Sequence, residues 1–257
     1  MARAIWKASI RFGPVSVPVK LYSTEKDVRL HSHLLHDEDR ERLQQRMVCS
    51  QEQTVVGRDE TIKGYEIEDD RYVVVDPNEL DAFEPEGSRE VEVMEFVEAA
   101  AVDPRYLDRT YFLGPDRDEQ AYANLARSLE QTGLAGMCRW VMRSRAYLGV
   151  LQHRAGVLSL TTHHYADEVV PEEALEIQRV KPSHREEAVA GNLVEELAEP
   201  FQPEQYHDEY EARLRSYVEQ KAQGKEMRLP RPKPPEPTKE QDLVGVLERS
   251  LNTLRKG

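Results

Sequence analysis

Cysteine is scarce in this chain of 257 residues, and long apolar runs are missing. The two cysteines, Cys49 and Cys138, cannot build the disulfide framework of a small secreted domain, so we expect a reducing, intracellular compartment. No run of about eighteen apolar residues occurs, which predicts no transmembrane helix. Near the N-terminus Arg3 and Lys7 interrupt the apolar residues, so we expect no secretory signal. These features predict a cytoplasmic protein that binds no membrane.

Signatures of catalysis are missing as well. Neither GxxxxGK[ST], GxGxxG nor GxSxG occurs, so nothing predicts a nucleotide site or a nucleophile elbow. His31, His33, His36 and Cys49 are the one metal-like group, but Ser50-Gln51-Glu52 follow Cys49, so the second thiolate of a CxxC pair is lacking. In a strand His163 and His164 would point to opposite faces. We therefore expect no enzyme, no cofactor and no metal.

Charge is unevenly distributed along the sequence. The net charge is −13, and residues 37–98 alone hold twenty acidic and seven basic residues. In contrast, residues 1–23 contain four bases and no acid, and residues 131–166 contain four arginines and no acid. An acidic total argues against a protein that coats nucleic acid indiscriminately, but a confined basic surface remains compatible with it.

The N-terminal basic stretch has the period of two that is typical of half-buried strands. Apolar residues from Trp6 to Phe12 alternate with Lys7, Ser9 and Arg11, and Gly13-Pro14 predicts a turn. A second strand, residues 15–21, exposes Lys20 and contains Pro18, which favours a sheet edge or a bulge. These strands would hold Lys7, Arg11 and Lys20 on exposed faces, either as a binding surface or as a solvated one.

Further elements follow along the chain. Residues 63–76 predict a hairpin that turns at Asp69-Asp70, and Asp76 with Glu79 predicts a capped helix start. Residues 91–96 and 109–115 predict strands, and residues 118–131 predict an amphipathic helix that ends at Gly133. The apolar segments 137–151 and 157–162 predict paired strands in the core, joined at Arg154-Ala155-Gly156.

Arginines in the 137–151 segment are the strongest candidates for binding. If this segment is one strand, Arg139, Arg143 and Arg145 share a face, opposite Trp140 and Met142. Such a row of guanidinium groups could bind phosphates without reading base sequence. A solvated sheet face is the alternative.

The character of the chain changes to helical from about Pro182. One apolar stripe contains Leu193 and Val194, and another contains Tyr210, Leu214 and Tyr217. Five prolines between Pro230 and Pro237 predict a stiff spacer, and the capping-box pattern at Thr238 opens a last amphipathic helix. Its apolar face would dock a partner or belong to a weakly ordered tail. The residues of that face are Leu243, Val246, Leu247, Leu251 and Leu254.

Several segments, in this order, resemble the bacterial Ku family. They are Arg3-AIWKASIRFGPVSVPVKLYS, Lys63-GYEIEDDRYVVVD, Asp103-PRYLDRTYFLGP, Ala121-YANLARSLEQTG, Tyr165-ADEV and Asp242-LVGVLERSL. The resemblance implies a non-enzymatic homodimer that forms a ring, threads onto ends of double-stranded DNA in nonhomologous end joining at the bacterial nucleoid, and recruits a multifunctional ATP-dependent DNA ligase. In a closed ring, end preference would come from topology and sequence independence from phosphate contacts.

The expected fold is mainly β with α. It has a Ku-type β-barrel core with ring-forming arms at 1–181, a helical C-terminal arm at 182–228, a Pro-rich linker at 229–237 and a ligase-docking helix at 238–257. Residues 37–98 would face away from DNA. Many relatives have a Lys-rich tail that this sequence lacks, and some have CxxC at Cys49, which this sequence also lacks.

We expect DNA contacts from seven cations chosen by charge segregation and strand facing. They are Lys7, Arg11, Lys20, Arg139, Arg143, Arg145 and Arg154. Two other classes remain open. The chain could be an acidic scaffold that docks a partner through its C-terminal helix without binding DNA, or a metal-dependent nuclease that uses its acidic block.

Overall fold

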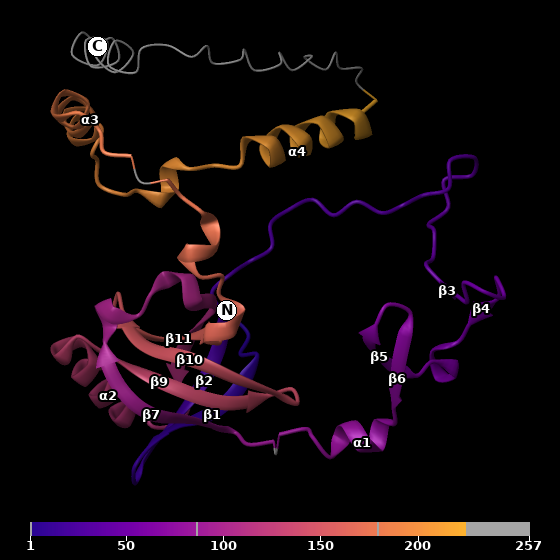
Figure 1. Cartoon of the computed structure of the whole chain (residues 1–257), viewed down its shortest axis with the longest axis horizontal. Coiled ribbons are helices and arrows are strands. Elements are labelled where there is room, and N and C mark those ends of the chain that lie inside the picture. The colour runs from indigo at the N-terminus through magenta and orange to yellow at the C-terminus, as the bar shows by residue number, and fades with distance from the viewer. Residues whose placement is uncertain (1, 86, 179, 225–257) are drawn as a thin grey trace. The chain divides into compact units, whose positions relative to one another are not determined.

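The structure is a computed structural model that describes residues 2–85, 87–178 and 180–224 (Figure 1). The chain divides into two compact units. One unit comprises Met1–Asp27 and His33–Glu172, and the other comprises Val28–Ser32 and Glu173–Gly257. The domain boundaries that we expect at 181, 228 and 237 stay predictions.

A closed seven-stranded barrel forms the core of the first unit, in the order β1-β2-β8-β11-β10-β9-β7. All neighbouring strands are antiparallel except β1 and β7, which are parallel. An odd number of strands cannot close with antiparallel pairs alone, so one parallel pair is required. The strands are β1 (Trp6–Phe12), β2 (Val15–Ser23), β7 (Glu90–Glu98), β8 (Leu107–Pro115), β9 (Leu134–Met142), β10 (Arg145–Arg154) and β11 (Val157–His163).

The first hairpin confirms the predicted alternation. Ala8 and Ile10 of β1 are buried, whereas Lys7 and Arg11 are exposed. Gly13 takes a φ of 54° in the turn, a conformation that glycine adopts without strain. The edge position expected from Pro18 is wrong, because β2 has β1 on one side and β8 on the other. Proline is tolerated there because the end of the β2–β8 ladder uses only its carbonyl, which accepts from Asp116 N at 3.0 Å, and the paired residues start at Val19 opposite Pro115.

The segment predicted as the core is buried, although it is two strands and not one. Cys138, Trp140 and Met142 of β9 and Leu151 of β10 point into the barrel with Leu160 of β11. A register shift between Val93 and Glu95 changes the alternation of β7 and places Phe96 opposite Gly136, on the same face as Val93, although Phe96 itself stays partly exposed.

Helix α2 (Glu119–Thr132) lies beside the barrel, close to the predicted range (Figure 1). Asp118 accepts a hydrogen bond from Ala121 N at 2.9 Å, and Gly133 ends the helix with a φ of 66°. Leu125, Ala126 and Leu129 are its buried residues. The hydroxyl of Tyr122 donates to the carbonyl of Leu113 (2.7 Å) and accepts from Leu158 N (3.0 Å), which ties α2 to β8 and β11.

Between β2 and β7 the chain forms two small sheets outside the barrel sheet. These are β3 (Met47–Val48) with β4 (Val55–Val56), and β5 (Lys63–Glu68) with β6 (Arg71–Val75), followed by α1 (Pro77–Asp81). The hairpin and the capping box of Asp76 and Glu79 are as predicted, with Asp70 at a φ of 59°. Apolar side chains such as Ile67 and Val74 remain exposed on these sheets.

In its described residues the second unit contains the α-helices α3 (His184–Glu196) and α4 (Glu209–Ala222), which confirms the helical character predicted there. Ser183 and Glu186 form the capping box of α3. Part of the predicted apolar stripes is exposed, including Val194 and Tyr210. The expected linker at 229–237 and helix at 238–257, with Leu243, Val246, Leu247, Leu251 and Leu254, lie outside the described residues.

Single turns of 3-10 helix complete the secondary structure. They are η1 (Arg58–Glu60), η2 (Ala99–Ala101), η3 (Pro104–Tyr106), η4 (Ala166–Glu168), η5 (Glu172–Leu175) and η6 (Pro203–Gln205). Over the described ranges, no helix has the length and apolar character that crossing a bilayer requires.

Candidate functional site

The seven cations predicted to contact DNA separate into two groups. Four lie along barrel strands: Lys7 and Arg11 on β1, Lys20 on β2 and Arg139 on β9. The other three, Arg143, Arg145 and Arg154, lie at or beside the turns at the two ends of β10. Within the residues that the structure describes, the strand group is paired with carboxylates and the turn group is not. This difference decides which of the seven cations are available to bind an external anion.

Lys7 and Lys20 lie opposite each other on β1 and β2. Like charges in that position repel, and Asp116 compensates them. Its carboxylate lies 3.0 Å from Nζ of Lys20 and 3.4 Å from Nζ of Lys7. The hydrogen bond from Lys20, followed by its charge and the contact with Lys7, holds the pKa of Asp116 below its usual value. The trio keeps one net positive charge.

Arg11 and Arg139 are each paired with an acid of β7. Nε of Arg11 lies 3.2 Å from Glu90, and Nε of Arg139 lies 2.6 Å from Glu92. The hydrogen bond from Arg139 and the charge of its guanidinium lower the pKa of Glu92, and the same bond and the carboxylate charge of Glu92 raise the pKa of Arg139. Glu90 and Glu92, which belong to the acidic segment 37–98, thus offset the charge of two arginines that we expect to bind phosphates. The acidic segment is therefore not separated in space from these basic residues.

The predicted shared face of Arg139, Arg143 and Arg145 is wrong. The chain turns at Arg143-Ser144, so Arg139 lies on β9 and Arg145 begins β10. Arg143 and Ser144 have φ values of 55° and 59°, so both adopt the left-handed conformation. Two-residue hairpin turns with this conformation usually contain Asn-Gly. Because this turn has Arg-Ser in place of Asn-Gly, the sequence does not predict a turn here. Arg143 and Arg145 are instead neighbours at one exposed hairpin tip.

Aromatic stacking connects this tip to the barrel core. Cζ of Arg145 lies 5.4 Å from the ring centre of Tyr147. The ring of Tyr147 stacks on that of Trp140 with a centroid distance of 5.4 Å and an interplanar angle of 14°. Trp140 is buried. A cation over an aromatic face is attracted to its π electrons, so this stack supports Arg145 without neutralising its charge.

Arg154 ends β10 at the opposite hairpin, beside the predicted turn. Ala155 and Gly156 take φ values of 49° and 83° there. Within the described part of the chain, Arg143, Arg145 and Arg154 form no ion pair with a carboxylate. They are therefore the predicted cations whose charge is available to an external phosphate.

Arg145 also lines a polar pocket of about 270 Å³ with residues that the site prediction omitted. These are Arg109 of β8, His163 and His164. The two histidines share the pocket because β11 ends at His163, so strand alternation does not extend to His164. Nδ1 of His163 lies 2.6 Å from the carbonyl of His164, and Nδ1 of His164 lies 3.7 Å from Glu168. Asp108 also lines this pocket, so its charge is mixed.

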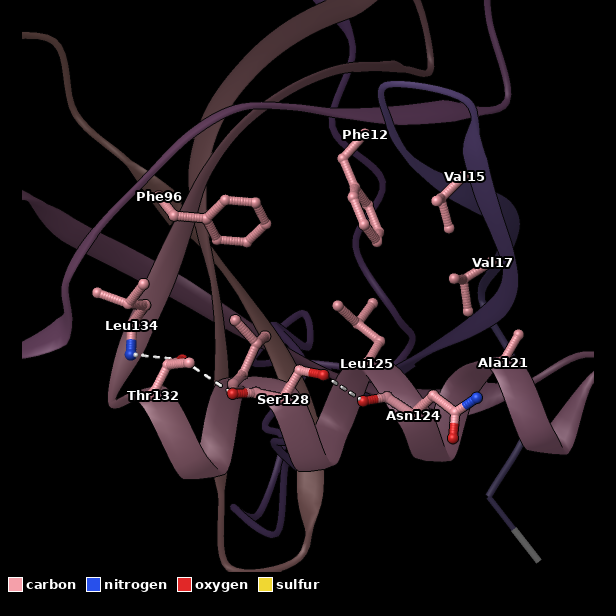
Figure 2. A pocket seen from close by; sticks show the side chains of 11 residues that line it. Phe12, Val15, Val17, Phe96, Ala121, Asn124, Leu125, Ser128, Thr132 and Leu134 are labelled. Atoms are coloured by element: carbon pink, nitrogen blue, oxygen red, sulfur yellow. Dashed lines mark hydrogen bonds between the residues drawn. The ribbon is translucent and has the colours of Figure 1, made fainter.

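A second pocket, of about 390 Å³, is apolar and lies between α2, the first hairpin and β7 (Figure 2). Phe12 and Phe96 meet edge to face across it, with centroids 6.0 Å apart. Its hydroxyl groups are already bonded to the helix, with Ser128 donating to Asn124 O (2.9 Å) and Thr132 donating to Ser128 O (2.8 Å). No charged side chain lines this pocket, so it offers nothing to a phosphate.

Cys49 lies in the turn between β3 and β4, and its backbone bonds to Thr54. Backbone hydrogen bonds from Glu52 and Gln51 lower the pKa of its thiol. Among the described residues, no group of three or more His, Cys, Asp or Glu side chains is placed to hold a metal ion. The acidic block thus presents no such cluster there for metal-dependent nuclease chemistry.

Comparisons with known proteins place the chain in a family. Residues 11–190 match the family model described as the Ku70/Ku80 beta-barrel domain. A Geotalea uraniireducens (strain Rf4) protein named "Non-homologous end joining protein Ku 2" is 41% identical over 247 residues, 96% of each chain. Proteins named "Non-homologous end joining protein Ku" are similar too. The Koribacter versatilis protein is 37% identical, and the match covers 99% of this chain and 88% of that protein. The Bacillus subtilis (strain 168) protein is 34% identical, and the match covers 98% of this chain and 82% of that protein.

The barrel, the matched segment and the nearly full-length relatives agree on one assignment. The chain belongs to the Ku family.

Proposed function

We propose that this protein binds the ends of double-stranded DNA without regard to sequence, as a ring-shaped homodimer in nonhomologous end joining, and recruits an ATP-dependent DNA ligase. Membership of the Ku family and the names of the relatives support the pathway. The protein itself is a binding protein and not an enzyme.

The observation that carries this proposal is the free arginine pair at the β9–β10 tip. Guanidinium groups bind phosphate oxygens through two parallel hydrogen bonds, and such contacts carry no sequence information. Arg143 and Arg145 are exposed and unpaired with acids in the described chain, whereas Arg11 and Arg139 are paired. The tip therefore leads the seven candidates, with Arg154 next, and Lys7, Arg11, Lys20 and Arg139 follow.

The ring and the homodimer are supported by unburied apolar surface. Residues 24–89 carry two small sheets with exposed apolar side chains, and α3 and α4 expose Val194, Tyr210 and Val218. Tyr65 of β5 and Val73 of β6 pair directly and are both exposed, and neighbouring exposed apolar side chains of this kind commonly mark a protein interface. A closed dimeric ring would load only at a DNA terminus, which would account for end preference.

Topological trapping tests the ring. The protein is bound to linear DNA, the ends are ligated, and the circle is then washed at high salt. A closed ring stays on the circle, because salt cannot release a topological link, and it leaves once a restriction enzyme reopens the DNA. Release from the closed circle at high salt would show an open binding surface instead.

Ligase recruitment is assigned to the segment after Pro237, on the amphipathic pattern of Leu243, Val246, Leu247, Leu251 and Leu254. A chain that ends at Pro237 should bind DNA ends as the full chain does but should no longer stimulate end joining by the cognate ligase. Stimulation that survives this deletion would exclude the docking role. The alternative, an acidic scaffold that docks a partner without DNA, predicts no DNA binding by either chain at moderate salt.

A further inference from the structure

Residues Val28–Ser32 form an unusual part of the second unit. They follow β2 and precede the segment 33–89, which carries β3 to β6, yet they group with the C-terminal helices and not with the barrel. They form no helix or strand. Two helical side chains, Glu211 and Arg215 of α4, bond to their backbone.

The bonds use one backbone donor and one backbone acceptor of residues 28–32. The N–H of Leu30 donates to Oε1 of Glu211 at 2.6 Å, and Nη2 of Arg215 donates to the carbonyl of Val28 at 2.8 Å. The same Nη2 also lies 3.3 Å from Oε1 of Glu211, so the two side chains are paired with each other. The result is one continuous network from the carbonyl of Val28 to the amide of Leu30.

The sequence of α4 explains how the network is built. Asp208 caps the helix by accepting from the amide of Glu211 at 2.9 Å, which fixes Glu211 in the first turn. Arg215 follows four residues later and therefore lies on the same face one turn on. The side chain of Glu211 is 14% exposed and that of Arg215 is 48% exposed. The network is thus partly shielded from water, which strengthens its charge-assisted bonds.

The contact is made to backbone atoms, so it holds the path of the chain and does not depend on which side chains stand at 28 and 30. The side chain of Val28 is 60% exposed, so its burial contributes little to this hold. A segment that is neither helix nor strand leaves its amide and carbonyl groups to water or to side chains. Here α4 supplies the partners that a neighbouring strand would supply in a sheet.

We propose that Glu211 and Arg215 are positioning residues, a backbone clamp that holds the chain where it enters the 33–89 segment and so keeps that segment in place for the ring that binds DNA ends. The second half of this proposal rests on the proposed function. The clamp also assigns α4 a role of its own, distinct from the ligase docking assigned to the segment after Pro237.

Hydrogen–deuterium exchange on the full-length chain tests the clamp directly. Glu211→Ala removes the acceptor of the Leu30 amide, so exchange in a peptide spanning residues 28–34 should accelerate roughly tenfold. Glu211→Gln keeps an acceptor oxygen and should retain part of the protection. Arg215→Ala is a second, independent variant and should also accelerate exchange. Arg213→Ala is the matched control, because Arg213 bonds to Glu209 O within α4 and should leave this peptide unchanged.

DNA-end binding by the same variants tests the functional half. Glu211→Ala and Arg215→Ala should weaken binding to linear duplex DNA, and Arg213→Ala should not. Circular dichroism should show that the helix content of all three variants is unchanged. Unchanged exchange in both clamp variants would overturn the clamp. Faster exchange with wild-type DNA affinity would overturn its functional role while leaving the proposed function intact. Failure of the wild-type chain to bind DNA ends would instead overturn the proposed function.

Discussion

Lys7 and Lys20 face each other across β1 and β2, and a single carboxylate, Asp116, lies within 3.4 Å of both ammonium groups. This arrangement places two positive charges side by side on the barrel and offsets only one of them. It gives a direct way to ask whether this face of the barrel contacts DNA, because one substitution frees both lysines.

Asp116→Asn should lower the melting temperature by a few degrees, since the two lysines then repel without compensation. Because the folded-state pKa of Asp116 is lowered from 3.8, its contribution is fully present above that value. It is lost as the pH falls through the lowered pKa. Melting curves from pH 7 down to pH 2.5 should therefore show the wild-type and variant proteins converging in acid. A difference that stays constant across this range would contradict the ion-pair account.

The same variant reports on DNA. If Lys7 and Lys20 contact phosphates, freeing them should tighten binding to linear duplex DNA at low salt and steepen its salt dependence. An affinity equal to that of the wild-type protein would remove both lysines from the candidate contacts.

Charge reversal at the hairpin tip tests the leading contacts. The double variant Arg143→Glu/Arg145→Glu should weaken binding to linear DNA by about tenfold or more at physiological salt. It should also flatten the plot of log affinity against log salt concentration, because a complex with fewer phosphate contacts releases fewer counterions when it forms. Fluorescence anisotropy over a salt series measures both effects. Arg127→Glu, on the exposed side of α2, is the control for added negative charge. Equal loss in the control would make the effect nonspecific.

The strained turn predicts opposite effects on stability and binding. Replacing Arg143-Ser144 by Asn-Gly supplies residues that accept positive φ, so the free energy of unfolding should rise by about 1 kcal/mol. DNA affinity should fall, because one guanidinium is lost, though by less than in the charge-reversed variant. Denaturant unfolding and anisotropy measure the two effects on the same samples. Higher stability with undiminished affinity would exclude Arg143 as a phosphate contact.

The two cysteines should differ sharply in reactivity. Backbone hydrogen bonds lower the pKa of Cys49 from 9.0, whereas burial raises that of Cys138 to about 12. A thiol reagent should therefore modify Cys49 rapidly in the native protein, and the plot of its rate against pH should have a midpoint below pH 9. Cys138 should react only on unfolding. Cys49→Ser should abolish the fast phase. A fast phase that persists in this variant would contradict the burial of Cys138.

Short-range patterns in the sequence were sufficient for much of the fold. The alternation from Trp6 to Leu21, the cap at Asp76 and the turn at Asp69-Asp70 each depend on neighbouring residues, and the structure has them where the sequence predicts them. The barrel itself was expected from the resemblance to a family and not from periodicity.

The candidate site was harder to predict, because its geometry depends on strand register. Glu92 reaches Arg139 only because β7 pairs with β9, a contact between residues 47 positions apart. The Arg143-Ser144 turn lacks the glycine or asparagine that marks such turns, so the sequence predicts a continuous strand there. Arg109 and His163 meet Arg145 only once three strands are assembled.

The most direct test of the central claim compares linear duplex DNA with the same DNA as a covalently closed circle, in a binding assay titrated with salt. The account predicts tight binding to the linear form that persists at moderate salt, with little binding to the circle. Equal affinity for both forms would contradict end recognition and indicate a generic cationic surface, and no binding to either would contradict DNA binding altogether.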